Sequence, residues 1–275
     1  MPPKDTLLSL DMGTDDCLYR LRRDLPSTST VIYIYLLTLS LLPTDSLTYG
    51  RNLIRDLRRT VPDWDEEWTT LTISREDDAV KVLRDEWAPH FLPASAITRE
   101  LPRINVLGVE VLKSLKNRVS RVRLPDKQQQ QRILKIRPFA YQLRYLAQEM
   151  RAYEMLWEKG CELVPGVGAY VSERSEEQVI GFLCEEIEGR FAGWGDYEKC
   201  REALGKLHGY GVVHGDLNRY NIIMAGERMR FVDLEKAVLD IDVEGEEFMR
   251  LCVEELEGLE KALGDEEGWG KPWGE

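Results

Sequence analysis

The sequence predicts an α+β protein, and two features of residues 105–275 support this. Short segments that alternate apolar and polar residues, typical of strands, surround one helical pattern between residues 105 and 188. From residue 189 onward, apolar residues recur mainly at helical spacing. An apolar fraction of 43% over 275 residues is enough to build a substantial core.

The first of these regions predicts a sheet with one helix. Its expected elements are strands at 106–112, 118–124 and 132–136, a helix at 140–158, and a strand pair at 167–171 and 179–184. The polar stretch 125–131, which includes four consecutive glutamines, predicts a loop. Gly160 is a stop signal for the helix.

The second region predicts two longer helices around a short strand pair. One helix begins near Asp196 and ends at Gly209, and two short strands flank a turn at 225–227. A final amphipathic helix follows, with an apolar face made by Phe248, Cys252, Leu256, Leu259 and Leu263. Residues 266–275 are expected to form a flexible acidic tail.

Residues 1–104 carry no recognisable motif and predict an extension of unknown role that is partly disordered. The apolar run from Val31 to Leu42 predicts a buried strand or helix. It is shorter than the ~20 residues that a membrane helix needs, so no membrane association is expected.

Charge and cysteine content exclude some classes of function. A net charge of −12 argues against sequence-independent nucleic-acid binding. The five cysteines form no CxxC pair and only three histidines are present, which argues against a zinc site. Unpatterned cysteines predict reduced thiols, and hence a cytoplasmic or nuclear protein. Nothing in the sequence indicates the oligomeric state.

The strongest functional signal is the segment HGDLNRYN, residues 214–221, followed by FVDLE at 231–235. It puts an acid, Asp216, five residues before an amide, Asn221, and a short strand pair then leads to a second acid, Asp233. Phosphoryl transfer depends on positioning and on charge neutralisation by a divalent metal. Asn221 and Asp233 supply the hard oxygen ligands that Mg²⁺ prefers. Asp216 is placed to accept a proton from an attacking hydroxyl.

These motifs resemble the catalytic loop and metal-binding motif of the protein-kinase-like superfamily. The HGD variant is similar to the motif of aminoglycoside and choline phosphotransferases and of small atypical kinases. The surrounding sequence resembles kinase-domain proteins of filamentous fungi. The resemblance covers residues 105–265. It implies a two-lobed fold, with an N-lobe at 105–188, a trimmed helical C-lobe at 189–265, and ATP and Mg²⁺ as cofactors.

The resemblance implies a phosphate-binding lysine, Lys135, held by a helix glutamate. Two glutamates compete for that place. Helical geometry puts Glu154 near the middle of the apolar face and Glu149 at its flank. The ExxAYxxL pattern and the length of helix that follows Glu149 favour Glu149, whereas Glu154 stays the alternative.

The resemblance also implies a hinge beside the adenine. Cys184 takes the gatekeeper place, and the backbone groups of Glu185 and Ile187 would then meet the adenine edge. Backbone contacts require no particular side chain, so the sequence tests this placement only weakly.

Several departures from the kinase pattern bear on function. No GxGxxG segment precedes Lys135, so a shorter β-turn would have to cover the phosphates. Gly215 replaces the arginine that usually reads a phosphorylated activation loop. Asn218 stands where Ser/Thr kinases carry a lysine, and Arg219 is the candidate for supplying a positive charge at the γ-phosphate.

The expected function is transfer of the γ-phosphate of Mg-ATP to a hydroxyl acceptor, with a protein Ser/Thr as the first choice. A small-molecule kinase of the aminoglycoside or choline type is the first alternative. A pseudokinase that acts as a nucleotide-binding or scaffold module is the second.

Overall fold

The computed structural model describes residues 3–124, 130–266 and 270–273, and divides the chain into two compact units. The first spans Met1–His90 and the second Phe91–Glu275. This division falls earlier than the boundary predicted at residue 104. The reason is that Leu92 is buried in the core of the second unit, and its N–H donates to the carbonyl of Val179 at 2.8 Å.

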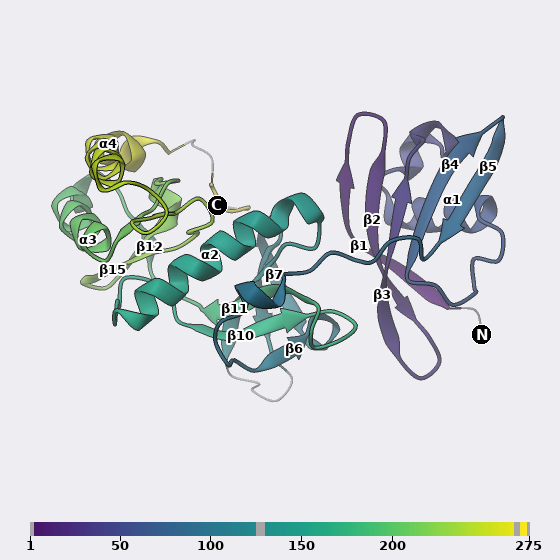
Figure 1. Ribbon diagram of the computed structural model, residues 1–275, viewed down its shortest axis with the longest axis horizontal. Helices are drawn as coiled ribbons and strands as arrows, with labels where there is room; N and C mark the ends of the chain where they lie inside the picture. Colours follow the sequence, from purple (N-terminus) through teal and green to yellow (C-terminus); the bar gives the residue numbers. More distant parts are fainter. Residues whose placement is uncertain (1–2, 125–129, 267–269, 274–275) are drawn as a thin grey trace. The chain divides into compact units, whose positions relative to one another are not determined.

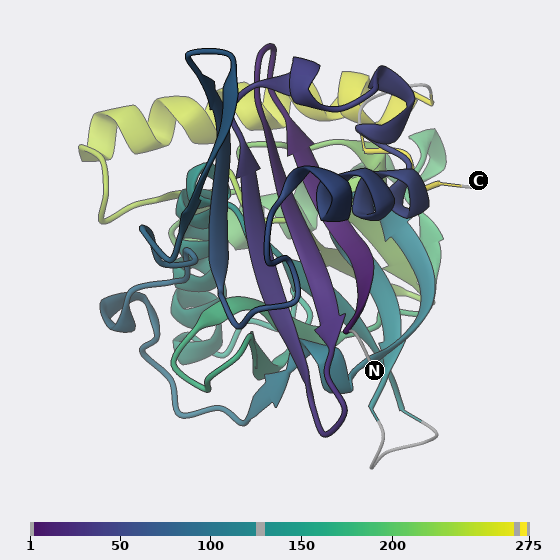
Figure 2. The same cartoon turned by 90° about the vertical axis from the view of Figure 1, so that its right-hand side faces the viewer.

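The first unit is a five-stranded sheet covered on one face by a helix (Figure 2). Its elements are β1 (Lys4–Met12), β2 (Cys17–Asp24), β3 (Ser29–Leu36), α1 (Gly50–Thr60), β4 (Thr70–Glu76) and β5 (Ala79–Arg84). The strands lie in chain order, with β3 and β4 parallel and the other neighbours antiparallel. The first half of the predicted apolar run, up to Leu36, therefore lies in a strand, β3.

The partial disorder expected for residues 1–104 is wrong for residues 3–90. The physical reason is a second core, to which alternate residues of β2 contribute. Cys17, Tyr19 and Leu21 face inward against α1 and two buried tryptophans, Trp64 and Trp68. This period-two pattern was present in the sequence, but the residues between its positions, apolar Leu18 and buried Arg20, do not form a polar outer face.

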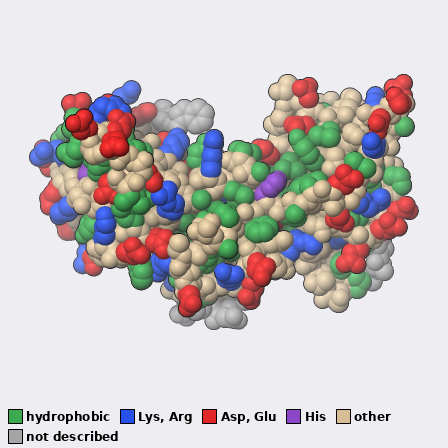
Figure 3. All heavy atoms as spheres, viewed as in Figure 1, with side chains coloured by type: hydrophobic (Ala, Val, Ile, Leu, Met, Phe, Trp, Pro, Cys, Tyr) green, Lys and Arg blue, Asp and Glu red, His purple; other side chains and the backbone are tan. Residues whose placement is uncertain are grey.

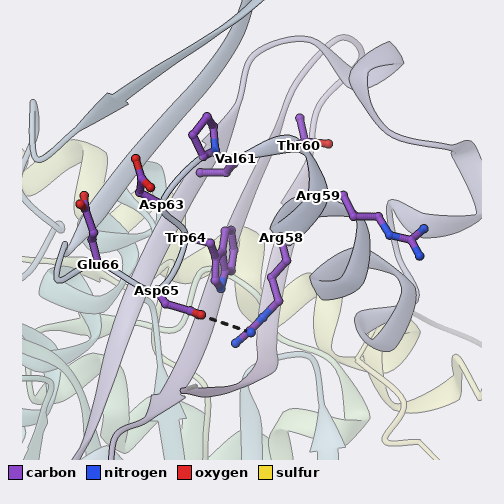
Figure 4. Close-up of a pocket in the computed structure, with 9 residues that line it drawn as sticks. Arg58, Arg59, Thr60, Val61, Asp63, Trp64, Asp65 and Glu66 are labelled. Atoms are coloured by element: carbon purple, nitrogen blue, oxygen red, sulfur yellow. Dashed lines mark ion pairs between the residues drawn. The ribbon is translucent and has the colours of Figure 1, made fainter. Parts of the chain in front are cut away.

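A buried carboxylate ties the chain after α1 to the first unit's sheet. Asp5 of β1 accepts from Arg23 Nε at 2.8 Å, from Arg58 Nη2 at 3.0 Å and from Trp64 Nε1 at 2.7 Å. Beside this network lies an open hollow lined by residues 58–66 (Figure 4). In that view Arg58 pairs with Asp65 at the rim, and Arg59 points away.

The second unit contains the predicted kinase-like region. Its strands are β6 (Arg103–Asn105), β7 (Glu110–Lys116), β8 (Val119–Arg123), β9 (Gln131–Ile136), β10 (Val167–Ser172), β11 (Val179–Glu185), β12 (Arg190–Phe191), β13 (Val212–Val213), β14 (Ile222–Ala225), β15 (Arg228–Phe231) and β16 (Val238–Leu239). Its helices are α2 (Ala140–Glu158), α3 (Tyr197–Gly209) and α4 (Gly245–Gly264).

The N-lobe is a six-stranded sheet in the order β6-β10-β11-β9-β8-β7, with α2 alongside it (Figure 1). The predicted helix at 140–158 and the strand pair after it are confirmed. The strand predicted at 106–112 is only partly right. Residues Val106–Gly108 form a 3₁₀ turn because Asn105 accepts the N–H of Leu107, and strand β7 starts at Glu110. Of the predicted loop at 125–131, residues 125–129 lie outside the described residues and Gln131 begins β9.

The C-lobe consists of α3 and α4 around two small sheets, β12-β14-β15 and β13-β16. The predicted α+β class is thus confirmed. Within the predicted tail, residues 267–269 and 274–275 lie outside the described residues, and the N–H of Trp273 donates to the carbonyl of Leu115 at 2.8 Å. Both signs of charge are interspersed on the face shown in Figure 3. No helix among the described residues is long and apolar enough to cross a membrane.

Candidate active site

The centre of the site is a buried ion-paired trio that joins the two lobes. Lys135 lies on β9, next to β11 in the middle of the N-lobe sheet. Its Nζ is 2.6 Å from Glu149 Oε1 on α2 and 2.5 Å from Asp233 Oδ1, just after β15. Of the two competing glutamates, the structure brings Glu149 to Lys135, whereas Glu154 makes no described contact with it.

Mutual attraction sets the charge state of this trio. Burial alone would lower the pKa of Lys135, but the charges of Asp233 and Glu149 outweigh it and raise that pKa. Burial would likewise raise the pKa of Asp233, yet the Lys135 ammonium holds it well below its usual range. Lys135 and Asp233 are therefore both charged at neutral pH.

The backbone around Asp233 is constrained on both sides. The N–H of Val232 donates to the carbonyl of Asn221 at 3.0 Å, and the Val232 carbonyl lies 3.0 Å from His214 Nε2. Asp233 itself has φ of 71°, in the left-handed region that few non-glycine residues occupy. Such strain persists only where neighbours fix the backbone, as they do here.

The catalytic-loop residues Asp216 and Asn221 are held side by side. Asn221 Nδ2 donates to the backbone carbonyl of Asp216 at 3.0 Å, and the Asn221 side chain is buried. Its Oδ1 is buried without a hydrogen-bond partner. A buried orphan acceptor near a charged carboxylate fits a hard cation such as Mg²⁺. Asn221 and Asp233 are the residues that would hold it.

Glu255 of α4 anchors the catalytic loop from below, a role that the sequence analysis missed. Its Oε1 accepts the N–H of Gly215 at 2.8 Å, and its Oε2 accepts the N–H of His214 at 3.0 Å and faces His208 Nε2 at 2.9 Å. Burial alone would raise the pKa of Glu255, but these hydrogen bonds lower it. A signal existed in the sequence, because Glu255 falls between Cys252 and Leu259 on the apolar face of the helix.

The cation next to Asp216 is Lys236, which the sequence analysis also missed. Lys236 Nζ lies 2.8 Å from Asp216 Oδ1. Arg219, predicted to supply positive charge at the γ-phosphate, instead pairs with Glu266 at 2.8 Å. The reason is that Arg219 begins a 3₁₀ turn, Arg219–Asn221, and its side chain lies over the Tyr220 ring toward the end of α4.

A cavity of about 370 Å³ opens beside the trio. Lys135, Asp233, Cys184, Glu185 and Ile187 line it, so the phosphate end and the predicted hinge share one cavity. Asp216, Arg219 and Asn221 are not among its lining residues. Glu149 stands behind Lys135.

The hinge leaves one donor available. The N–H of Glu185 donates to the carbonyl of Gly166 at 2.9 Å, whereas the N–H of Ile187 has no partner among the described residues. The side chains of Arg121 and Glu186, which both line the cavity, pair at 2.5 Å. Because Ile187 also lines the cavity, its N–H is a candidate donor to a ligand.

The β7–β8 hairpin precedes Lys135 in the chain and contributes residues to the cavity lining. Its two-residue turn is Asn117-Arg118, with Arg118 at φ of 65°. The hairpin directs Lys116 into the cavity, where its Nζ is 4.0 Å from Asp233 Oδ2. Burial lowers the pKa of Lys116. A short turn thus precedes Lys135 in the chain, and the strand that leads into it ends in a lysine that the sequence analysis did not single out.

Comparison with known proteins finds a family match for the segment that contains the catalytic loop. Residues 195–257 match the RIO domain family. A stretch of 47 residues, 17% of this chain, is 47% identical to a probable bifunctional tRNA threonylcarbamoyladenosine biosynthesis protein of Methanosarcina mazei and spans 9% of it. A stretch of 54 residues, 20% of this chain, is 43% identical to the RIO-type serine/threonine-protein kinase Rio1 of Haloferax volcanii and spans 19% of it. Each match therefore covers less than a fifth of the relative.

These matches confirm the resemblance to the protein-kinase-like superfamily, to whose atypical members the RIO domain belongs. The RIO match spans Asp216, Asn221, Asp233, Lys236 and Glu255. It supports an atypical protein-kinase-like phosphotransferase, and such a family implies ATP and a divalent metal.

Proposed function

We propose that this protein transfers the γ-phosphate of ATP to a hydroxyl acceptor, with a protein Ser or Thr side chain as the first candidate. The observation that carries the proposal is the convergence of Lys135, Glu149 and Asp233 beside one cavity, with Asn221 and Asp216 on the adjoining loop. A divalent metal held by Asn221 and Asp233 would neutralise charge on the phosphates.

The cavity suits a nucleotide base at its inner end. Val119 and Ile133 contribute apolar walls from the N-lobe, and Ile223 and Phe191 contribute them from the C-lobe. A flat aromatic base fits between such walls, and the free N–H of Ile187 would bind its edge. Lys135 and Lys116 at the other end would then meet the phosphates.

Asp216 is the proposed proton acceptor. In the transfer step the acceptor oxygen bonds to the γ-phosphorus, the bridging bond to the β-phosphate breaks, and ADP leaves. The hydroxyl proton passes to the Asp216 carboxylate. The 38% exposure of the Asp216 side chain leaves room for an acceptor to approach.

The Ser/Thr acceptor is supported by the match to a RIO-type serine/threonine-protein kinase. A small-molecule alcohol is the second candidate, favoured by a C-lobe in which α3 and α4 are the only helices of eight or more residues that the structure describes. A pseudokinase is the third. The direct Lys135–Asp233 ion pair favours it, because it engages the phosphate-binding lysine with the carboxylate that would hold the metal.

Two measurements test this proposal. The first is the thermal shift of the full chain with ATP, with and without Mg²⁺, and the expected result is a larger shift with metal than without. The second is release or transfer of the labelled γ-phosphate by the wild type and by Asp216→Asn. We expect a rate loss of about a hundredfold in the variant, with ATP binding retained. Binding without any transfer by the wild type supports the pseudokinase, and no binding at all rejects the proposal.

A further inference from the structure

The inference concerns the cation at Asp216. The side chains of Lys236 and Asp216 are 50% and 38% exposed, so the pair faces the solvent side of the catalytic loop. The hydrogen bond to Asp216 raises the pKa of Lys236, which keeps the amine charged. Lys236 occupies only one oxygen of the carboxylate, Oδ1, so the other remains available to an acceptor hydroxyl.

The turn that carries Lys236 is fixed from three directions. The N–H of Ala237 donates to the carbonyl of Leu234 at 3.1 Å, which closes a β-turn. Gln148 of α2 donates to the carbonyl of Ala237 at 2.7 Å, and Glu235 pairs with Arg137 at the end of β9. The backbone that carries Lys236 is therefore held in place although the lysine side chain is half exposed.

Gly215 shows that the catalytic loop is built around this turn. Its φ is 76°, and a Cβ there would lie 2.1 Å from the backbone carbonyl oxygen of Lys236. No other residue type fits this approach without moving the backbone. The glycine of the HGD segment therefore allows Lys236 to sit beside the aspartate that follows it.

The other candidate cation of the loop is otherwise engaged. Arg219 pairs with Glu266 and lies over the Tyr220 ring, on the side of the loop that faces the end of α4. Among the described ion pairs, Lys236 is the cation bound to Asp216.

We propose that Lys236 binds the γ-phosphoryl group during transfer and holds Asp216 in position, in place of a cation on the catalytic loop itself. This inference rests on the proposed phosphotransferase function. As the acceptor oxygen bonds to phosphorus and the bridging bond to ADP breaks, negative charge spreads over the phosphoryl oxygens. A fixed ammonium next to the proton acceptor stabilises that charge without reorganising.

The test compares Lys236→Met, Lys236→Arg and a matched control, Lys206→Met. Lys206 is also an exposed C-lobe lysine paired with a carboxylate, Glu202, at 2.7 Å. The readout is γ-phosphate release and self-labelling from labelled Mg-ATP, fitted for kcat and KM. We expect Lys236→Met to lower kcat at least about tenfold while the KM for ATP changes less than about threefold. Lys236→Arg should restore part of kcat, and Lys206→Met should match the wild type.

A chemical rescue separates charge from structure. Adding ethylammonium to Lys236→Ala should raise kcat with saturation, whereas Lys206→Ala should show no response. An unchanged or higher kcat in Lys236→Met overturns the inference, and so does an equal loss in Lys236→Met and Lys236→Arg without amine rescue. If the wild type itself releases no more phosphate than Asp216→Asn, the proposed function and this inference both fail. If the wild type is active and the Lys236 variants are as active as the wild type, this inference fails while the proposed function stands.

Discussion

Lys135 Nζ and Asp233 Oδ1 lie 2.5 Å apart although 98 positions separate them in the chain. Each sits on a different lobe of the second unit, and Glu149 supplies a second carboxylate at 2.6 Å. A buried ammonium between two carboxylates has lost its hydration and is costly to leave unpaired. The trio therefore fixes how strand β9, helix α2 and the segment after β15 meet, which is the geometry that a nucleotide site needs.

Glu149→Ala tests the role of this trio in stability and binding. Removing one partner of a buried ion pair should lower the free energy of unfolding by about 3 kcal/mol, since Lys135 keeps Asp233. It should also weaken ATP binding about tenfold or more, because the lysine loses its orientation. The measurements are denaturant unfolding of the full chain and ATP titration.

Glu154→Ala is the matched control on the same helix. It lies one turn and a residue further along α2, is only partly buried, and makes no described contact with Lys135. We expect a change within about 0.5 kcal/mol and unaltered ATP affinity. Equal losses in the two variants would contradict the assignment of Glu149.

Glu255→Gln should weaken the anchoring of the catalytic loop in a pH-dependent way. The pKa of Glu255 is lowered in the folded state from an ordinary value of 4.5. Its stabilising effect is therefore fully present above pH 4.5 and is lost as the pH falls through the lowered pKa. At pH 7 the variant should be less stable by about 1–3 kcal/mol.

The measurement is unfolding free energy from pH 7 down to pH 3 for both proteins. The gap between wild type and variant should shrink below pH 4.5. Glu257→Gln, an exposed position on the same helix, should show no such gap. A gap that stays constant over this range would mean that Glu255 does not act as a charged acceptor.

Local patterns in the sequence were sufficient to predict the elements of the second unit that position the site. The helix Ala140–Glu158 and the strand carrying Lys135 follow from periodicity and from Gly and Pro signals. The pairing of Lys135 with Glu149 followed from the resemblance together with the helix length. These are predictions in which sequence-local information and the fold agree.

What the sequence could not provide depends on contacts made far along the chain. Lys236 and Arg219 are both cations near the motif, and only the turn at 234–237 decides which one meets Asp216. Lys116 sits 117 positions from Asp233, and no local pattern shows that a hairpin points it into the cavity. The first unit was missed because arginines such as Arg23 are buried there through the Asp5 network, which breaks the usual apolar pattern.

Gly215→Ala should destabilise the protein and reduce activity together. A Cβ would lie 2.1 Å from the Lys236 carbonyl oxygen, and φ of 76° is unfavourable for alanine. We expect a loss of about 1–3 kcal/mol, measured by denaturant unfolding. Gly205→Ala, at an exposed position inside α3 with nothing within 4 Å of the added Cβ, should instead stabilise by about 0.5–1 kcal/mol. A neutral Gly215→Ala would show that the loop can move away from the Lys236 turn.

Asp5→Ala should strongly destabilise the first unit. Asp5 is completely buried and binds Arg23, Arg58 and Trp64, so its removal leaves a buried guanidinium without its carboxylate. The expected loss is about 3–5 kcal/mol. Tryptophan fluorescence during unfolding reports it, because Arg23 lies 4.5 Å from the Trp68 ring centroid and 5.2 Å from that of Trp64.

The matched control for Asp5→Ala is Asp65→Ala, which removes a half-exposed partner of the same arginine, Arg58 (Figure 4). Because an exposed ion pair contributes little, this variant should change stability by less than about 1 kcal/mol. A small effect of Asp5→Ala, similar to that of Asp65→Ala, would mean that hydrophobic packing around Trp64 and Trp68 holds the unit without the carboxylate. A large effect confined to Asp5→Ala would identify the buried charge network as what joins the chain after α1 to the sheet.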